Sequence, residues 1–168
     1  LSSPRIYHEY SHMCTEPNPP ACFIRMEELG LLKAISPQLA LTPTRRETLM
    51  RMREMVSWYH LLYLEEPVQH WLAYFLALCH NLNYEDARSV YERFGLPPQR
   101  RAAVFHLREK ARYLCSRLES WQRKQSDAHT DVFDFWKMLE GLELEFLLYL
   151  MAATDEEGLQ KNFSRYIT

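Results

Sequence analysis

The first residues that could do chemistry are His8-Glu9-Tyr10-Ser11-His12, a formal match to the H-E-x-x-H signature of zinc peptidases. Two histidines four residues apart on a helix point the same way and can hold one zinc ion, with the glutamate between them as general base. A third ligand is also needed, and only Glu27 or Glu28 on a second helix could formally serve. Prolines crowd the turn before them and no active-site strand precedes the motif. We therefore expect no metal site here, and a surface or packing role for both histidines.

The four cysteines do not form a metal-binding pattern either. Their spacing is irregular, and no C-x-x-C pair or second histidine pair accompanies them. A site built from Cys14 and Cys22 with His8 and His12 is the alternative to buried free thiols. Free thiols, which are typical of a reducing cytoplasm, fit the irregular spacing better. We therefore expect free thiols at all four positions, Cys14, Cys22, Cys79 and Cys115.

Other catalytic patterns are missing from the sequence. It contains no G-x-S-x-G nucleophile elbow and no clustered D-x-D carboxylates. With only four glycines in 168 residues, a glycine-rich phosphate loop is nearly excluded. We therefore predict no catalytic residues, and expect that this chain is not catalytic alone.

Composition sets the remaining limits. The chain is 47% hydrophobic, its formal charge is −2, and it is long enough for one sizeable core. This charge excludes a globally basic nucleic-acid binder but leaves room for a basic face. No apolar run reaches the roughly 18 residues that span a bilayer, so we expect a cytoplasmic protein without a membrane partner. Because the chain starts at Leu1 rather than Met, we expect a domain excised from a longer protein.

The elements that must position these residues are almost all helices. Apolar residues recur at spacings of three and four, and no stretch alternates every second residue as strands do. The sequence predicts an all-α fold of eight or nine helices in one compact domain, possibly with lobes at 1–82 and 83–168. The expected helices cover about 3–14, 20–29, 42–64, 65–79, 83–95, 97–124, 130–139, 142–153 and 155–166, with a short turn-like piece at 31–35.

Both ends of the chain resemble one known family. Residues 5–10, RIYHEY, resemble the "R-[IL]-x-x-E-L" helix that follows the catalytic head of tRNA nucleotidyltransferases and poly(A) polymerases, with Tyr10 in place of the usual Leu. Residues 26–37, MEELGLLKAISP, are similar to that family's "L-x-E-x-G-L-L-x-x-[IL]-x-P". Residues 142–153 resemble its "L-x-x-E-x-L-L-Y-x-M-A" helix and residues 164–168 its "I-S-x-Y-L/I-T". The middle of the chain matches only in helical pattern.

The resemblance implies a function for a larger protein. The chain would be an RNA-binding body or tail that positions a tRNA 3′ end for a catalytic head of the same polypeptide. That head, with its metal-binding D-x-D pair, is absent here, so Mg²⁺ and a nucleoside triphosphate are implied only for the parent enzyme. Glu9 would be a structural carboxylate near Arg5. The alternative is a helical protein-interaction or scaffold module without RNA binding.

An RNA-gripping tail needs cations spaced to meet phosphates. Arg101, Arg108 and Arg112 fall close to one helical face, and we predict that the RNA-binding residues are Arg100, Arg101, Arg108, Lys110, Arg112 and Arg117, with Arg123 and Lys124 beyond them. A second candidate cluster comprises Arg45, Arg46, Arg51 and Arg53. In the alternative interpretation, these cations belong to solvated helix faces and pair locally with Glu109, Glu119, Glu47 and Glu54.

Overall fold

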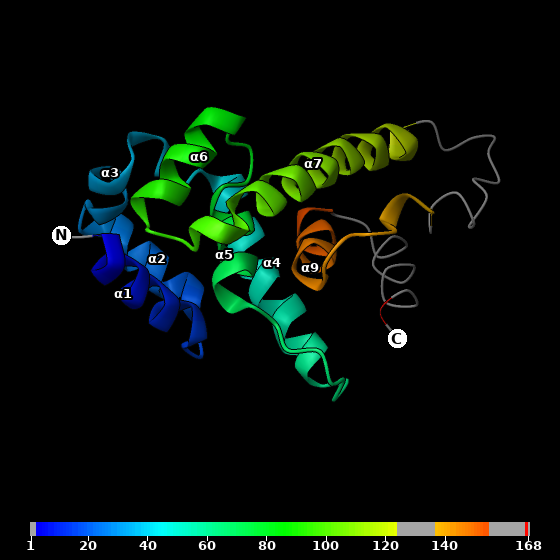
Figure 1. The fold of residues 1–168 in the computed structure, drawn as a ribbon, viewed down its shortest axis with the longest axis horizontal. Helices are drawn as coiled ribbons and strands as arrows, with labels where there is room; N and C mark the ends of the chain where they lie inside the picture. Colours follow the sequence, from blue (N-terminus) through cyan, green and yellow to red (C-terminus); the bar gives the residue numbers. More distant parts are fainter. Residues whose placement is uncertain (1–2, 124–136, 155–166, 168) are drawn as a thin grey trace.

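The computed structural model describes residues 3–123, 137–154 and 167, and these residues contain helices but no strand (Figure 1). The all-α prediction is thereby confirmed for the described part of the chain. The expected helix at 155–166 lies outside the described residues, as does the one at 130–139 except for a helical turn at 137–139. The helices are α1 Ser3–Thr15, α2 Pro19–Glu28, α3 Leu31–Ile35, α4 Pro43–His60, α5 His70–Leu78, α6 Tyr84–Arg93, α7 Arg101–Arg123 and α9 Leu144–Ala153, with 3₁₀ turns η1 Pro37–Leu39 and η2 Pro98–Arg100.

Local chemistry explains most helix ends. Pro43 opens α4, and the Thr42 side chain caps it by accepting the Arg45 backbone N–H at 3.2 Å. Asn83 caps α6 in the same way, accepting the Asp86 N–H at 2.8 Å. After α2, the chain turns at Gly30 with φ +70°, a left-handed conformation that favours glycine.

Two predicted boundaries are wrong, and both lie between α4 and α5. The predicted helix to Leu64 ends at His60, and the helix expected from Glu65 begins only at His70. Tyr63 adopts a left-handed φ of 52°, which interrupts any helix there. The connection is instead fixed by a hydrogen bond of 2.9 Å from the Tyr59 hydroxyl to the Glu66 carbonyl.

The core is built around α5. Residues 72–78 are each at most 1% exposed, as expected for a helix that is hydrophobic on all sides. Helices α1, α4 and α9 pack against α5, while α4 and α7 also pack against α9. In Figure 1, α1–α3 and α6 lie towards the N-terminus, and α7 runs from the centre towards the opposite end. Contacts of α4 and α5 with α9 therefore join segments from before and after Leu82.

Aromatic rings fix α6 and α7 onto this core. Tyr91 of α6 lies edge-on to Phe75 of α5, with ring centroids 5.4 Å apart, and to Phe105 of α7 at 5.6 Å. The Tyr91 hydroxyl donates to the Pro97 carbonyl at 2.7 Å, which holds the turn between the two helices. The surface formed by α6 and α7 is thus rigidly placed relative to α5.

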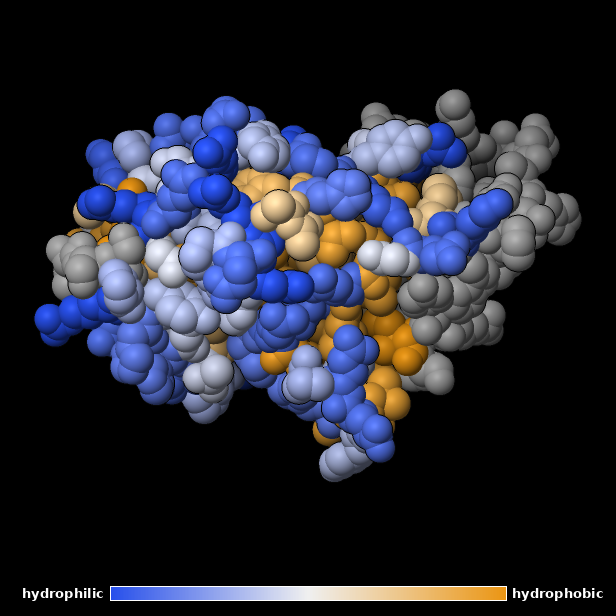
Figure 2. All heavy atoms as spheres, in the orientation of Figure 1, coloured by the Kyte–Doolittle hydropathy of each residue, from blue (hydrophilic) through white to orange (hydrophobic). Residues whose placement is uncertain are grey.

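The described helices include none with the length and apolar character needed to cross a membrane. On the face drawn in Figure 2, hydrophobic atoms gather over α9 and beside the connection between α4 and α5, whereas hydrophilic side chains cover much of the rest. The exposed apolar side chains of that connection are Leu61, Tyr63 and Leu64.

Candidate nucleic-acid interface

Positive charge is concentrated on α6, η2 and α7. Residues 88–117 contain eight basic and only two acidic side chains, whereas the whole chain has 20 basic and 22 acidic ones. The remainder of the chain therefore carries 12 basic and 20 acidic residues. The chain is nearly neutral overall, but its charge is unevenly distributed along the sequence. The basic segment lies on α6 and α7, the two helices that the aromatic contacts hold in place.

Helix α7 has a buried face and an outward face. Val104, Ala111 and Leu118 are at most 2% exposed and mark the side that packs into the core. Tyr113 lies on the opposite side and is 57% exposed, and His106 and Arg117 are exposed on the same outward face. Of the predicted trio, Arg108 lies beside the buried stripe, whereas Arg101 and Arg112 lie farther towards the outward face, so the three differ widely in exposure.

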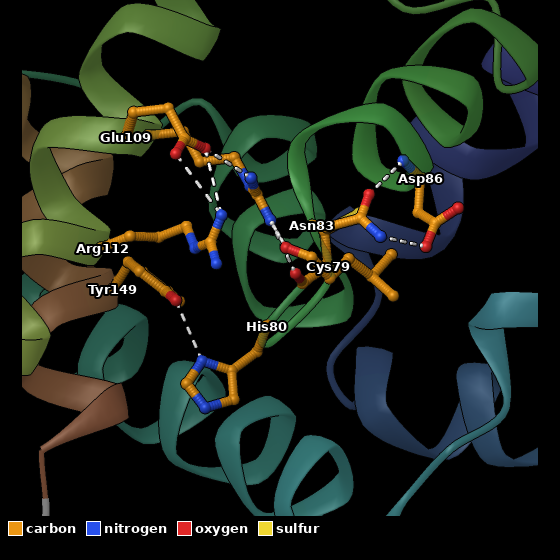
Figure 3. A network of polar contacts seen from close by, with 9 residues as sticks. Cys79, His80, Asn83, Asp86, Glu109, Arg112 and Tyr149 are labelled. Carbon is orange, nitrogen blue, oxygen red and sulfur yellow. Dashed lines mark hydrogen bonds and ion pairs between the residues drawn. The ribbon is translucent and has the colours of Figure 1, made fainter.

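Arg108 does not reach the surface. Its side chain is 3% exposed, and its guanidinium donates to the backbone carbonyls of Cys79 at 3.1 Å and Leu82 at 2.6 Å (Figure 3). Its other terminal nitrogen lies 2.9 Å from a Glu109 carboxylate oxygen. These contacts satisfy carbonyls that follow the C-terminus of α5, where a positive charge is favourable. In this fold Arg108 is therefore a structural residue, unlike the phosphate contact that the spacing predicted.

The remaining predicted cations are partly or fully accessible. Arg101 is paired with Glu92 at 2.9 Å, and Arg112 is paired with Glu109 at 3.4 Å. Arg100 is ion-paired with Glu143, and this hydrogen bond raises the pKa of the arginine. Lys110 donates to the carbonyl of Glu140, and Arg117 donates to the Tyr113 hydroxyl at 3.1 Å. Surface pairs of this kind contribute little stability, so these cations can exchange their partners for phosphate at small cost. Arg123 is the last residue of α7, and Lys124 lies outside the described residues.

Near Arg112 lies a partly buried polar contact between the turn that follows α5 and helix α9. His80 Nδ1 and the Tyr149 hydroxyl are 2.9 Å apart (Figure 3). Burial, together with the nearby positive charges of Arg45, Arg108 and Arg112, lowers the pKa of His80 to about 4. His80 is therefore neutral at physiological pH, and the charge of this region comes from its arginines.

The second predicted cluster is divided between core and surface. Arg45 is 5% exposed and donates to the carbonyls of Gln38, Ala40 and His80, so it also satisfies the region after α5. Burial lowers its pKa. Arg51 pairs with Glu47 at 2.7 Å, as the local-pairing alternative predicted. Arg46 and Arg53 donate to the carbonyls of Leu41 and Pro17, each at 3.2 Å. This cluster therefore does not form one basic surface.

The zinc-peptidase pattern places its histidines together. The rings of His8 and His12 have centroids 4.5 Å apart on the outer side of α1. Glu9 lies 4.0 Å from His8 Nδ1, while Glu27 accepts the backbone N–H of Leu41 at 3.2 Å. Within residues 3–123 and 137–154, no group of three His, Cys, Asp or Glu side chains is arranged to hold a metal ion.

Glu9 and Arg5 instead border an apolar groove between α1, α3 and α6. Its volume is about 340 Å³, and its apolar lining comprises Ile6, Tyr10, Met13, Met26, Leu31, Ala34, Ile35 and Phe94. Arg93 completes the polar rim. The sequence analysis did not identify this groove, because α1–α3 form it together with the end of α6, which is distant from them in sequence.

Tyr113 is another feature that the sequence analysis did not single out. The signal was available, because Tyr113 is opposite the apolar stripe of α7 and Arg117 follows it by four residues. In the structure the Arg117 guanidinium carbon lies 5.8 Å from the centre of the Tyr113 ring.

Comparisons with known proteins agree with this architecture. A family model described as the probable RNA- and SrmB-binding site of polymerase A matches residues 1–42. A curated A-adding tRNA nucleotidyltransferase of Geobacter sulfurreducens is 30% identical over 168 residues, which are 100% of this chain but only 19% of that protein. Two solved structures of a CCA-adding enzyme, one with ATP and one with CTP, each superpose with a TM-score of 0.77 at 17% identity. Each superposition covers 98% of this chain, and this corresponds to 38% of the ATP-bound chain and 37% of the CTP-bound chain. At this level of identity, the two structures support the fold alone.

Proposed function

The chain is a helical domain of the tRNA nucleotidyltransferase and poly(A) polymerase family, and we propose from this membership that it binds RNA, with tRNA as the principal partner. In the longer protein it would position the RNA 3′ end for a catalytic head of the same polypeptide. The head would add nucleotides from a nucleoside triphosphate with Mg²⁺, in the cytoplasm. The 168 residues themselves would bind and position the RNA rather than catalyse the reaction.

The observation that carries this proposal is the charge polarity of the domain. Eight of the 20 basic residues lie between positions 88 and 117, against two of the 22 acidic ones, and all eight except Arg108 are at least partly exposed. A surface of this kind attracts a polyanion even when the net charge of the protein is slightly negative. The accessible cations of this segment, led by Arg101, Lys110, Arg112 and Arg117, would meet phosphates and read backbone shape rather than base sequence.

The buried arginines hold the helices that carry this surface in place. Arg108 and Arg45 hold the carbonyls that follow α5, and thereby fix α7 and α4 to the same end of the central helix. Arg112 lies one turn beyond Arg108 and is 38% exposed through its side chain. A rigid base for the exposed cations reduces the entropy lost when RNA binds.

One observation favours the alternative, a helical protein-interaction module without RNA binding. The groove between α1, α3 and α6 is lined mainly by apolar side chains and opens to solvent. Grooves of this type receive apolar anchors from protein partners. RNA affinity and its salt dependence separate the two functions, because an apolar protein contact does not need the cations of α7.

The test is binding of a tRNA transcript to the purified chain at several salt concentrations, with Arg112→Gln beside Arg25→Gln. The two arginines are matched, since each pairs with a glutamate three residues away, Arg112 with Glu109 and Arg25 with Glu28. Only Arg112 belongs to the basic segment. We expect Arg112→Gln to weaken binding several-fold and to reduce the salt slope by about one unit per lost phosphate contact.

Arg25→Gln should leave both quantities unchanged. A chain that is folded by circular dichroism but does not bind tRNA at low salt would contradict the proposal. Equal losses from the two substitutions would show that binding follows total charge rather than the α6–α7 surface.

A further inference from the structure

The outward face of α7 carries an aromatic ring among its cations. His106, Lys110, Tyr113 and Arg117 are spaced at i, i+4, i+7 and i+11, which places them along one stripe of the helix. This stripe spans roughly 16 Å at 1.5 Å per residue. Tyr113 is 57% exposed, although a tyrosine ring carries a large apolar surface that folding usually buries.

The surroundings of the ring differ from those of the other tyrosines that are exposed in the described part of the chain. Tyr63 is 89% exposed but lies beside Glu65 and Glu66 in the connection between α4 and α5. Tyr84, at 42% exposure, packs edge-on against Phe105 with ring centroids 5.1 Å apart. Tyr113 lies inside the basic segment, in contact with a guanidinium.

Arg117 fixes the position of the Tyr113 ring. It donates to the Tyr113 hydroxyl at 3.1 Å, and its guanidinium carbon lies 5.8 Å from the ring centre. Ser116 donates to the Tyr113 carbonyl at 2.8 Å, a local contact that stays within the helix. The ring is thus held by its own helix and remains open to solvent, which lowers the entropy cost of using it as a contact surface.

We propose that Tyr113 is a stacking platform for an unpaired RNA base, with Arg117 and Lys110 beside it to contact the phosphates on either side. An aromatic ring flanked by cations is the arrangement that binds single-stranded or looped nucleic acid, because every base has a π-face. A fully paired duplex hides its bases and offers only backbone to this surface. The inference rests on the proposed RNA binding and adds to it a preference for unpaired nucleotides.

The test compares two substitutions at Tyr113 and one at Tyr63. Tyr113→Leu removes the ring but keeps an apolar, helix-favouring side chain, and Tyr113→Phe keeps the ring without the hydroxyl. Tyr63→Leu removes an exposed tyrosine outside the basic segment. Affinities would be measured by fluorescence anisotropy for three RNAs: a single-stranded oligoadenylate, a tRNA transcript and a fully paired RNA duplex. Thermal unfolding by circular dichroism would verify that each variant is folded.

The expected result is that Tyr113→Leu weakens binding of the oligoadenylate roughly tenfold, within the range for the loss of one aromatic–base stack. Tyr113→Phe keeps the ring but not the hydroxyl that Arg117 contacts, so it should lose much less affinity than Tyr113→Leu. Tyr63→Leu should bind the oligoadenylate as the original chain does, and no substitution should affect the duplex. An unchanged affinity of Tyr113→Leu for the oligoadenylate would overturn the stacking role alone, provided that the original chain binds RNA. An equal loss on the duplex would also overturn it. If the original chain binds none of the three RNAs, the proposed function fails, and the stacking role fails with it.

Discussion

The guanidinium of Arg108 lies 2.6 Å from the carbonyl oxygen of Leu82, 26 residues earlier in the chain. Through this contact a cation of α7, the helix with the most basic surface, stabilises the turn that follows the central helix. The surrounding surface cations have carboxylate, carbonyl or hydroxyl partners at the protein exterior, whereas the whole Arg108 residue is only 2% exposed. One helix thus carries arginines of two kinds, and substitutions should distinguish them.

Arg108→Gln should lower the free energy of unfolding by about 3 kcal/mol, because the carbonyls of Cys79 and Leu82 would lose a charged donor inside the protein. Arg101→Gln is the matched control on the same helix, with its side chain 45% exposed, and should change stability by less than about 0.5 kcal/mol. Urea unfolding monitored by circular dichroism measures both. Equal midpoints for the two variants would show that the Arg108 contacts add no stability.

Acidification should destabilise the protein through His80. Its folded pKa of about 4 lies below the ordinary value of 6.5, so between these values the unfolded chain binds a proton that the folded chain does not. Stability from this group is full above pH 6.5 and falls as the pH decreases towards 4. The shift corresponds to about 3 kcal/mol, which partial exposure reduces to about 2 kcal/mol.

Urea unfolding at several pH values between 7 and 4 tests this expectation. His80→Gln should lose less stability than the original chain over that interval. His106→Gln, which alters an exposed histidine of α7, should follow the original chain. A pH dependence that is the same with and without His80 would refute the assignment.

Glu145 should have the opposite effect. It is 2% exposed in the apolar helix α9, and burial raises its pKa, although its carboxylate accepts the Gln69 N–H at 2.6 Å. A raised folded pKa means that stability is present below the unfolded pKa and is lost as the pH rises through the folded pKa. Glu145→Gln keeps an acceptor for Gln69 without the charge, so it should be more stable than the original chain at pH 7 and equal to it near pH 4.

Glu145→Ala removes the acceptor as well and should be about 2 kcal/mol less stable than Glu145→Gln at either pH. Thermal unfolding of the three proteins in parallel distinguishes these outcomes. If Glu145→Gln were as unstable as Glu145→Ala at pH 7, the carboxylate charge itself would be stabilising.

Thiol reactivity should differ between cysteines of the same chain. Cys14 and Cys79 are fully buried, and burial raises the pKa of both, that of Cys79 to about 12. Cys22 lies on α2 and is partly exposed. Iodoacetamide should therefore alkylate Cys22 much faster than Cys14 or Cys79 in the folded protein. Peptide mass spectrometry gives the rates, and the difference should disappear in urea. Similar folded-state rates for Cys14 and Cys22 would contradict the described burial.

The sequence predicted helices well wherever local chemistry defines them. Pro43 with Thr42, Asn83 and Gly30 each begin or end a helix through contacts within a few residues. The start of α5 was predicted wrongly because the contact that positions it comes from a residue distant in sequence. Gln69 is held by Glu145, 76 residues away, and no local pattern reveals such a contact.

The sequence indicated which segment of the chain carries the candidate interface, but not which of its cations lie at the surface. Composition and spacing correctly indicated that α7 is rich in cations. Periodicity could also have shown that Arg108 shares the apolar stripe of Ala111 and Val104, whereas an arginine is ordinarily expected in solvent. Its acceptors at Cys79 and Leu82 exist only once α5 and α7 have packed together.

The complete burial of residues 72–78 in α5 has a consequence for measurement. Residues 72–78 contact protein on every side, so no small local opening can expose their backbone amides to water. Their hydrogens should exchange with deuterium only when the whole domain unfolds. The slowest exchange rates of this helix thus give the global free energy of unfolding directly, without added denaturant.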